Sequence, residues 1–107
     1  MEPLLVLTNV PDLASAEKLA RALVERRAAA CVNLLPGCRS IYRWQGAVET
    51  ADEIPLLIKT TAAAYAEVEA VVRAQHPYAV PELVAVPITH GLPAYLDWVA
   101  KETEKHD

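Results

Sequence analysis

The stretch CRSIYRWQGAVETADEIPLLIKTT, residues 38–61, contains two long β-type segments joined by Gln45-Gly46. The first segment is rich in β-branched and aromatic residues, and Gly46 can supply the positive φ that a tight hairpin turn requires. The returning segment, from Ala47 to Thr60, is about fourteen residues long and would reach roughly 45 Å at the rise of a β-strand. A compact domain of this size measures roughly 26 to 30 Å across. The hairpin is therefore predicted to project beyond the rest of the chain.

The chain before the hairpin predicts a strand, a helix and a second strand region. Residues 4–10, LLVLTNV, are expected to form a buried strand. A helix then follows from Asp12, which can cap it, to about residue 29, because apolar residues recur there at the helical period. The second strand region begins near Cys31 and is interrupted by Pro36-Gly37, which is a turn or bulge signal.

The chain after the hairpin predicts a helix, a strand and a final helix. Residues 61–75 carry an apolar stripe at helical spacing. This helix should stop at His76, because Pro77 disfavours helical geometry in the residue before it. Residues 83–88, LVAVPI, predict the last strand, and Pro93 can open a short helix, since proline is well tolerated at the first helical position.

The complete order contains the βαββαβ unit, in which two helices cover one face of an antiparallel sheet. The predicted fold class is therefore α+β, with an extra C-terminal helix, in a single domain over residues 1–107. Pro55 cannot donate a ladder hydrogen bond and should lie at an edge or bulge.

The far end of the hairpin would stand in water in a monomer, although it carries Ile41, Tyr42, Trp44 and Val48. Association into a closed ring of copies would cover these residues and pair the strand edges. The alternative is a strand that breaks at Pro55 and stays within one subunit.

Composition and charge argue against several classes of protein. The formal net charge is -4, and the basic residues are dispersed apart from Arg26-Arg27, so no binding to nucleic acid is expected. No apolar run is long enough to cross a bilayer, and Glu2 stands where a signal peptide carries basic residues, so a cytoplasmic protein without membrane association is expected. Cys31 and Cys38 lack zinc-site spacing and are expected to be free, small buried residues.

The segment QHPYAVPEL, residues 75–83, concentrates stiff and ionisable residues in one connection. His76 is the strongest candidate for a transition-metal ligand, because neutral imidazole suits copper, zinc and nickel. Glu82 and Glu53 are the candidate oxygen donors beside it. In the alternative interpretation, His76 is a structural residue that caps the preceding helix, and the prolines only fix the corner.

A second candidate site is the acidic run ETADE, which contains Glu49, Asp52 and Glu53. Three neighbouring carboxylates could hold a hard cation. The alternative is a solvated surface on which these acids pair with bases, and Glu53 could then pair with Lys59 or Arg43.

A third candidate is a polar pocket between subunits, to which Lys59, Tyr78, Cys31 and Trp44 are expected to contribute. Lys59 could bind an anion there. The sequence contains no Ser/His/Asp or Cys/His arrangement of the kind that nucleophilic catalysis needs. We therefore expect no catalytic residues and no enzymatic activity.

Four segments carry a resemblance to a known family: AACVNLLPGCRSIYRWQG, LLIKTT, HPYAVPEL and PITHGLPAYLDWV. In this order and spacing the chain resembles the CutA divalent-cation tolerance family over almost its full length. The resemblance implies a ferredoxin-like fold and a homotrimer, similar to PII-type signalling trimers, in which long hairpins extend each neighbour's sheet. It also implies a cytoplasmic role in tolerance of copper and other divalent metals, and it implies no known reaction.

Two functional hypotheses follow. The leading one is a non-enzymatic homotrimer that binds divalent metal ions, copper first and zinc as another possibility, and contributes to metal tolerance. Members of the family that bind copper have a cysteine in the first strand and two adjacent histidines, whereas Thr8 and Gln75 stand at the matching positions here and leave only His76. The alternative is a signalling trimer that binds a small anionic metabolite in the cleft between subunits.

Overall fold

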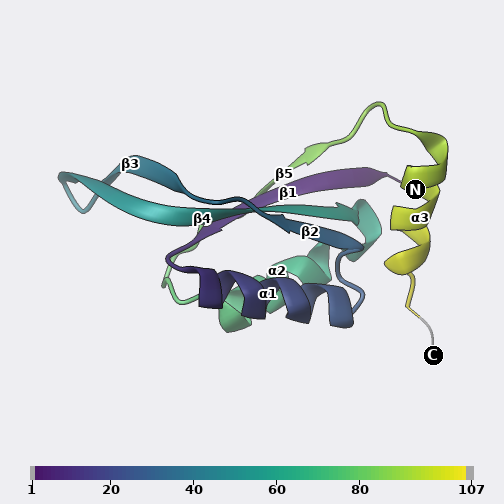
Figure 1. Ribbon diagram of the computed structural model, residues 1–107, viewed down its shortest axis with the longest axis horizontal. Helices are drawn as coiled ribbons and strands as arrows, with labels where there is room; N and C mark the ends of the chain where they lie inside the picture. The colour runs from purple at the N-terminus through teal and green to yellow at the C-terminus, as the bar shows by residue number, and fades with distance from the viewer. Residues whose placement is uncertain (1, 106–107) are drawn as a thin grey trace.

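The computed structural model describes residues 2–105 as a layer of β-sheet with helices on one face and at one end (Figure 1). The strands are β1 (Pro3–Val10), β2 (Cys31–Leu34), β3 (Cys38–Trp44), β4 (Ala47–Thr61) and β5 (Val84–Pro87). The helices are α1 (Leu13–Glu25), the short 3₁₀ turn η1 (Ala62–Ala64), α2 (Tyr65–Gln75) and α3 (Pro93–Glu102). The α+β class is confirmed, and so is the βαββαβ order with an added C-terminal helix, in which β2 and β3 together form the strand region interrupted at Pro36-Gly37. Within residues 2–105, none of the helices is both long and apolar enough to cross a membrane.

Strand β4 organises the sheet, because it pairs with three other strands, all antiparallel. The strand order is β2-β4-β1-β5, and β3 pairs with β4 beyond the end of β2. The change of partner occurs at Pro55: Leu34 pairs with Leu56, whereas Cys38 pairs with Glu53. The carbonyl oxygen of Pro55 accepts a hydrogen bond of 3.0 Å from the backbone nitrogen of Leu35. The proline therefore lies at a break in the ladder, where its missing N–H interrupts no pairing.

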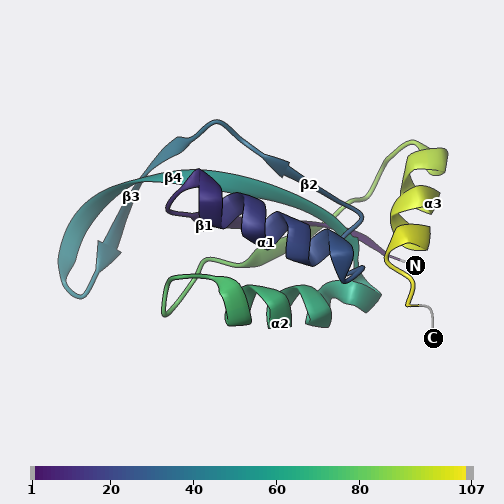
Figure 2. The ribbon, with the colours of Figure 1, turned by 60° about the horizontal axis from the view of Figure 1, so that its bottom comes forward.

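The hairpin formed by β3 and β4 turns at Gln45 and Gly46, which have φ angles of 50° and 83°. Positive φ at both central residues is the conformation that matches the twist of two-residue hairpins. The hairpin curls away beyond the helical layer (Figure 2), and the chain measures 44 Å along its longest axis against 29 and 23 Å along the others. The predicted projection of the hairpin is therefore confirmed.

The core lies between the sheet and the pair of helices α1 and α2. Alternate residues of the two central strands are at most 1% exposed and face the helices: Val6, Thr8, Val10, Leu56, Ile58 and Thr60. Buried residues of the helices complete it: Ala16, Leu19, Leu23, Val68, Val71 and Val72. This alternation follows from the strand geometry, in which successive side chains point to opposite faces.

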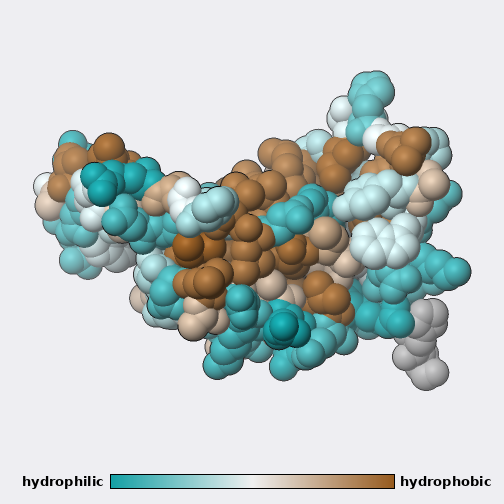
Figure 3. Space-filling view, in the orientation of Figure 1, coloured by the Kyte–Doolittle hydropathy of each residue, from teal (hydrophilic) through white to brown (hydrophobic). Residues whose placement is uncertain are grey.

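The opposite face of the sheet has no helix pair to cover it, and we call it the open sheet face. Pairing register places two rows of side chains there, Val86–Leu5–Lys59–Cys31 and Val84–Leu7–Leu57–Asn33. Val84 and Val86 are 49% and 45% exposed. Hydrophobic residues are visible over the middle of the sheet and again at the hairpin end in Figure 3.

Two local expectations need correction. Helix α1 ends at Glu25 rather than near residue 29, because Arg27 adopts a left-handed φ of 58°. The backbone nitrogen of Arg27 donates to the carbonyl of Val24, and that of Ala28 to the carbonyl of Leu23, at 3.1 and 2.9 Å. This is the Schellman closure of a helix, here without the usual glycine. The two cysteines are free as expected, but both are half-buried rather than fully buried.

Candidate functional site

A groove of about 670 Å³ lies between the hairpin and the connection from α2 to β5. We call it the hairpin groove. Its lining from the hairpin comprises Ser40, Ile41, Tyr42, Trp44, Glu49 and Glu53, and its lining from the connection comprises Tyr78, Ala79, Val80 and Glu82. The volume is within the usual range of small-molecule sites.

The lining of the groove combines negative charge with aromatic surface. Three of the lining residues are glutamates, and none is basic. Tyr42, Trp44 and Tyr78 are 40%, 44% and 37% exposed, so their rings remain partly available. Carboxylates attract cations, and so do the faces of aromatic rings. The groove therefore suits a cation and disfavours an anion.

A hydrogen bond between Tyr78 and Glu53 lies in the lining of the groove. The Tyr78 hydroxyl donates a hydrogen bond of 2.9 Å to Oε2 of Glu53, and Glu53 is only 9% exposed. Burial raises the pKa of Tyr78 to about 12, and the hydrogen bond to the Glu53 carboxylate adds to the rise. Tyr78 is therefore a neutral donor over the whole physiological pH range, and it holds the glutamate in place.

This contact predicts a loss of stability at alkaline pH. The ordinary tyrosine pKa is 10.0 and that of Tyr78 in the folded chain is about 12, so Tyr78 ionises more readily in the unfolded chain. Its contribution to the free energy of unfolding is fully present below pH 10 and is lost as the pH rises through 12. Denaturant unfolding at a series of pH values between 10 and 12 measures this loss. The free energy of unfolding should fall less steeply with pH for Tyr78→Phe than for the wild type. Parallel declines would contradict the assignment.

His76 packs beside Tyr78 of the groove, with the ring centroids 4.9 Å apart, and both of its ring nitrogens are engaged. Nε2 is 2.7 Å from the carbonyl oxygen of Asn9, and Nδ1 accepts a hydrogen bond of 3.1 Å from the backbone nitrogen of Tyr78. Because Nδ1 accepts, Nε2 carries the proton and donates, which is the pattern of a neutral imidazole. The residue is 8% exposed, and its backbone nitrogen closes α2 on the carbonyl of Val72 at 2.8 Å. The structural interpretation is therefore the one that this geometry fits, and His76 has no free nitrogen for a metal.

The other predicted metal ligands, Glu82 and Glu53, also have hydrogen-bond partners, and these partners differ. Oε1 of Glu82 accepts from Nδ2 of Asn9 at 3.1 Å, and the Glu82 carbonyl accepts from the Thr8 hydroxyl at 2.6 Å. Within residues 2–105, no three His, Cys, Asp or Glu side chains are grouped so that they could hold a metal ion. The predicted set of His76, Glu82 and Glu53 thus does not form a metal site within one chain.

The acidic run is divided between the two faces of β4. Asp52 forms an ion pair with Arg39 at 3.1 Å, and both side chains are largely exposed. Side chains on a strand alternate between its two faces, and Glu49 and Glu53 are four residues apart. They therefore share the groove side of β4, whereas Asp52 points to the other side. Glu53 accepts its hydrogen bond from Tyr78, whereas the alternative interpretation of the acidic run offered Lys59 or Arg43 as its partner.

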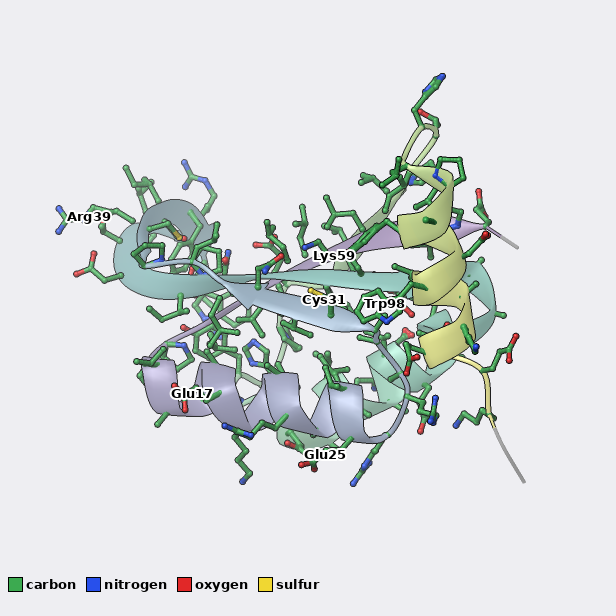
Figure 4. All side chains as sticks on the ribbon, turned by 45° about the vertical axis from the view of Figure 1, so that its right-hand side comes forward. Glu17, Glu25, Cys31, Arg39, Lys59 and Trp98 are labelled. Atoms are coloured by element: carbon green, nitrogen blue, oxygen red, sulfur yellow. The ribbon has the colours of Figure 1, made fainter. Side chains whose placement is uncertain are left out.

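The predicted pocket of Lys59, Tyr78, Cys31 and Trp44 is split between two places. Tyr78 and Trp44 line the hairpin groove. Lys59 and Cys31 pair in register on the open sheet face, beside α3 (Figure 4). There the Lys59 ammonium donates to the Asn33 side-chain oxygen.

Two aromatic residues of α3 lie at this same end of the sheet. The centroids of the Tyr95 and Trp98 rings are 5.7 Å apart. Residues three positions apart on a helix share a face, so the two rings pack on each other. Burial raises the pKa of Tyr95, and its contact with Cys31 adds to the rise. Helix α3 itself packs against β4 and β1 at this end of the sheet.

Sequence reasoning treated Tyr42 only as an apolar residue and did not place it in a site. The signal was the strand period: Tyr42 is two residues from Trp44, and in the hairpin register it lies opposite Glu49. Alternate residues of both hairpin strands therefore belong to one wall, together with Glu53.

The chain is similar to known proteins in both sequence and structure. The family described as CutA1 divalent ion tolerance protein matches residues 4–102. The Divalent-cation tolerance protein CutA of Thermus thermophilus is 52% identical over 98 residues, which cover 92% of this chain and 95% of that protein. A crystal structure of CutA from Xylella fastidiosa superposes with a TM-score of 0.94 at 47% identity and covers 97% of this chain and all of that one.

A more distant solved structure gives the same fold. The structure described as the periplasmic divalent cation tolerance protein CutA from Archaeoglobus fulgidus has a TM-score of 0.92 at 36% identity and covers 95% of this chain and 99% of that one. The ferredoxin-like α+β fold inferred from four sequence segments is thus shared along almost the whole chain. The chain belongs to the CutA1 divalent ion tolerance protein family.

Proposed function

We propose that the protein is a cytoplasmic homotrimer that supports tolerance of divalent metal ions, copper among them, and catalyses no reaction of its own. Membership of a family described by divalent ion tolerance supports the general role. The single observation that carries the assembly is the open sheet face, on which apolar residues lie in rows without a covering layer of helices.

The strand edges support the same assembly. β2 and β3 form one edge of the sheet and β5 forms the other, so a head-to-tail contact between copies can pair unlike edges and close into a ring. The hairpin carries Ile41 and Val48, which are 72% and 65% exposed. Exposed apolar surface of this kind marks an interaction site.

Metal binding is proposed to need more than one copy. Residues 2–105 of one chain contain no group of three suitable ligands, whereas an assembly of copies would place carboxylates of neighbouring chains together. A monomeric variant should therefore lose copper binding, and His76 should contribute nothing to it directly. The substitution Leu57→Asp, on the open sheet face, should produce such a monomer.

The substitution His76→Ala tests whether the imidazole of His76 is a copper ligand. Cu(II) affinity in titration calorimetry should remain that of the wild type, because both nitrogens already serve Asn9 and Tyr78. The free energy of unfolding should fall by about 1–3 kcal/mol, because the buried groups that bond to the ring lose their partner. His90→Ala is the matched control for non-specific binding by an exposed imidazole. Loss of copper affinity in His76→Ala alone would show that the ring is a ligand after all.

The alternative of a signalling trimer for a small anionic metabolite finds less support. The groove carries three carboxylates and no basic residue. Lys59, the residue expected to bind the anion, lies on the open sheet face with its ammonium on Asn33. An anion is therefore not proposed as the ligand of the hairpin groove.

A further inference from the structure

We infer that Lys59 of one copy enters the hairpin groove of the next copy in the proposed trimer and pairs there with Glu53. This contact rests on the proposed assembly and specifies it further, because it states which surfaces of neighbouring copies meet and which charges join them. Three features of the chain support it: opposite charges at the two ends of one uncovered strand side, the lack of a charged partner for either of them, and complementary apolar surfaces around them.

The uncovered side of β4 has an acidic end and a basic end. Leu56 and Ile58 are buried against the helices, and side chains on a strand alternate between its two faces. The side away from the helices therefore carries Glu49 and Glu53 toward the hairpin turn and Lys59 toward α3. A contact that joins the acidic end of one copy to the basic end of the next can be repeated around a closed ring.

The two charges cannot meet within one chain. Glu53 and Lys59 are six residues apart on the same continuous strand, so their backbones are separated by roughly 20 Å at the rise of a β-strand. Neither side chain is long enough to span this distance. An ion pair between these two positions therefore requires two copies.

Glu53 lacks a charged partner in its own chain. Its side chain is 9% exposed, and its Oε2 atom accepts the hydrogen bond from the neutral Tyr78 hydroxyl. The hydrogen bonds and ion pairs among residues 2–105 leave Oε1 without a donor. Burying a carboxylate is costly unless a charge compensates it. The lining of the groove contains no basic residue, so the compensating charge has to come from outside the chain.

Lys59 is the charged residue in the two rows of the open sheet face. Its ammonium donates to the neutral side-chain amide of Asn33, and the ion pairs among residues 2–105 do not include it. Figure 4 shows Lys59 beside α3, on the same part of the sheet as Cys31. A layer that covers this face would take the ammonium out of water, which is costly unless the layer brings a carboxylate.

The surfaces around the two charges are also complementary. The open sheet face presents Val84, Val86 and Leu57, and the groove side of the hairpin presents the half-exposed rings of Tyr42 and Trp44. Aromatic rings packed on aliphatic side chains are typical of the buried centre of an interface. A small cation in the groove would compensate the acidic end but leave the apolar rows exposed. A second copy accounts for both.

A double-mutant cycle on the association of the whole protein tests the contact. Sedimentation over a dilution series, in urea below the unfolding transition, gives the concentration at which the trimer is half dissociated. Lys59→Gln and Glu53→Gln should each raise this concentration about tenfold or more, because each leaves the other charge covered without a partner. The double variant should raise it no further than the more strongly affected single variant, because both changes remove the same contact.

Two matched variants control for general charge. Asp52→Asn removes a carboxylate one position away that pairs with Arg39, and Lys101→Gln removes an exposed ammonium from α3. Both should leave the half-dissociation concentration within about twofold of the wild type. If Glu53→Gln does not fold, Glu53→Asp takes its place in the cycle, because it keeps the charge but shortens its reach.

The outcomes separate this contact from the trimer itself. A trimeric wild type in which neither single variant shifts dissociation, or in which the two shifts multiply in the double variant, would refute the pairing and leave the trimer standing. Such a result would assign the acidic groove to small cations of the solvent. Equal shifts in the control variants would also refute the pairing. A monomeric wild type would overturn the trimer and the contact together.

Discussion

Replacing Leu57 by aspartate is expected to convert the proposed trimer into a folded monomer. Leu57 lies on the open sheet face between Leu7 and Asn33 in the pairing register. A carboxylate there would be buried without a partner in any contact that covers this face, at a cost of several kcal/mol. The neighbouring helix-facing residues are unchanged, so the fold of the single chain should persist.

Light scattering on a sizing column measures the mass, and circular dichroism measures the retained fold. The expected wild type has the mass of three chains, and Leu57→Asp has the mass of one. Ala74→Asp adds the same charge at an exposed position on α2 and should leave the mass of the wild type unchanged. A wild type that is monomeric at micromolar concentration would remove the basis of the proposed assembly.

Replacing Ile58 by alanine is expected to lower the free energy of unfolding by about 2–5 kcal/mol. Ile58 is fully buried between the sheet and the helices, so the shortened side chain leaves a cavity that the surrounding residues fill only in part. Because this residue points away from the open sheet face, the mass of the assembly should not change. Ile58 and Leu57 are adjacent in the chain, yet the two substitutions should separate stability from association.

Urea unfolding at several protein concentrations measures the effect of Ile58→Ala. Leu13→Ala is a suitable comparison, because Leu13 is 55% exposed on α1 and its truncation should change the free energy by only about 0.5 kcal/mol. A loss below about 1 kcal/mol for Ile58→Ala would mean that this part of the core collapses around the missing atoms.

The features of the chain that its sequence predicts correctly are local ones. The hairpin turn at Gln45-Gly46, the cap at Asp12 and the helix start at Pro93 were all predictable, because each depends on the conformational preferences of a few adjacent residues. The end of α1 was missed for a related reason: Arg27 takes the left-handed conformation that glycine normally signals.

The candidate site depended on contacts that adjacent residues do not reveal. Among the residues predicted as one metal set, His76 bonds to Asn9, which is 67 positions away, and Glu53 bonds to Tyr78, which is 25 positions away. Residue type indicated that His76 and the glutamates could bind a metal. Whether their donor atoms remained free was decided by partners that only the folded chain brings near.

The sequence alone determined the order of elements, the two-layer fold and the length of the hairpin, because strand and helix periods and turn residues act over short distances. Only the tertiary structure decided which of the two alternating sets of β4 side chains meets the helices. It also decided that Glu49 and Glu53 line the groove. The physical reason is that a side chain's function depends on its neighbours in space. In this chain those neighbours are set by strand register and by the curl of the hairpin over the 78–82 connection.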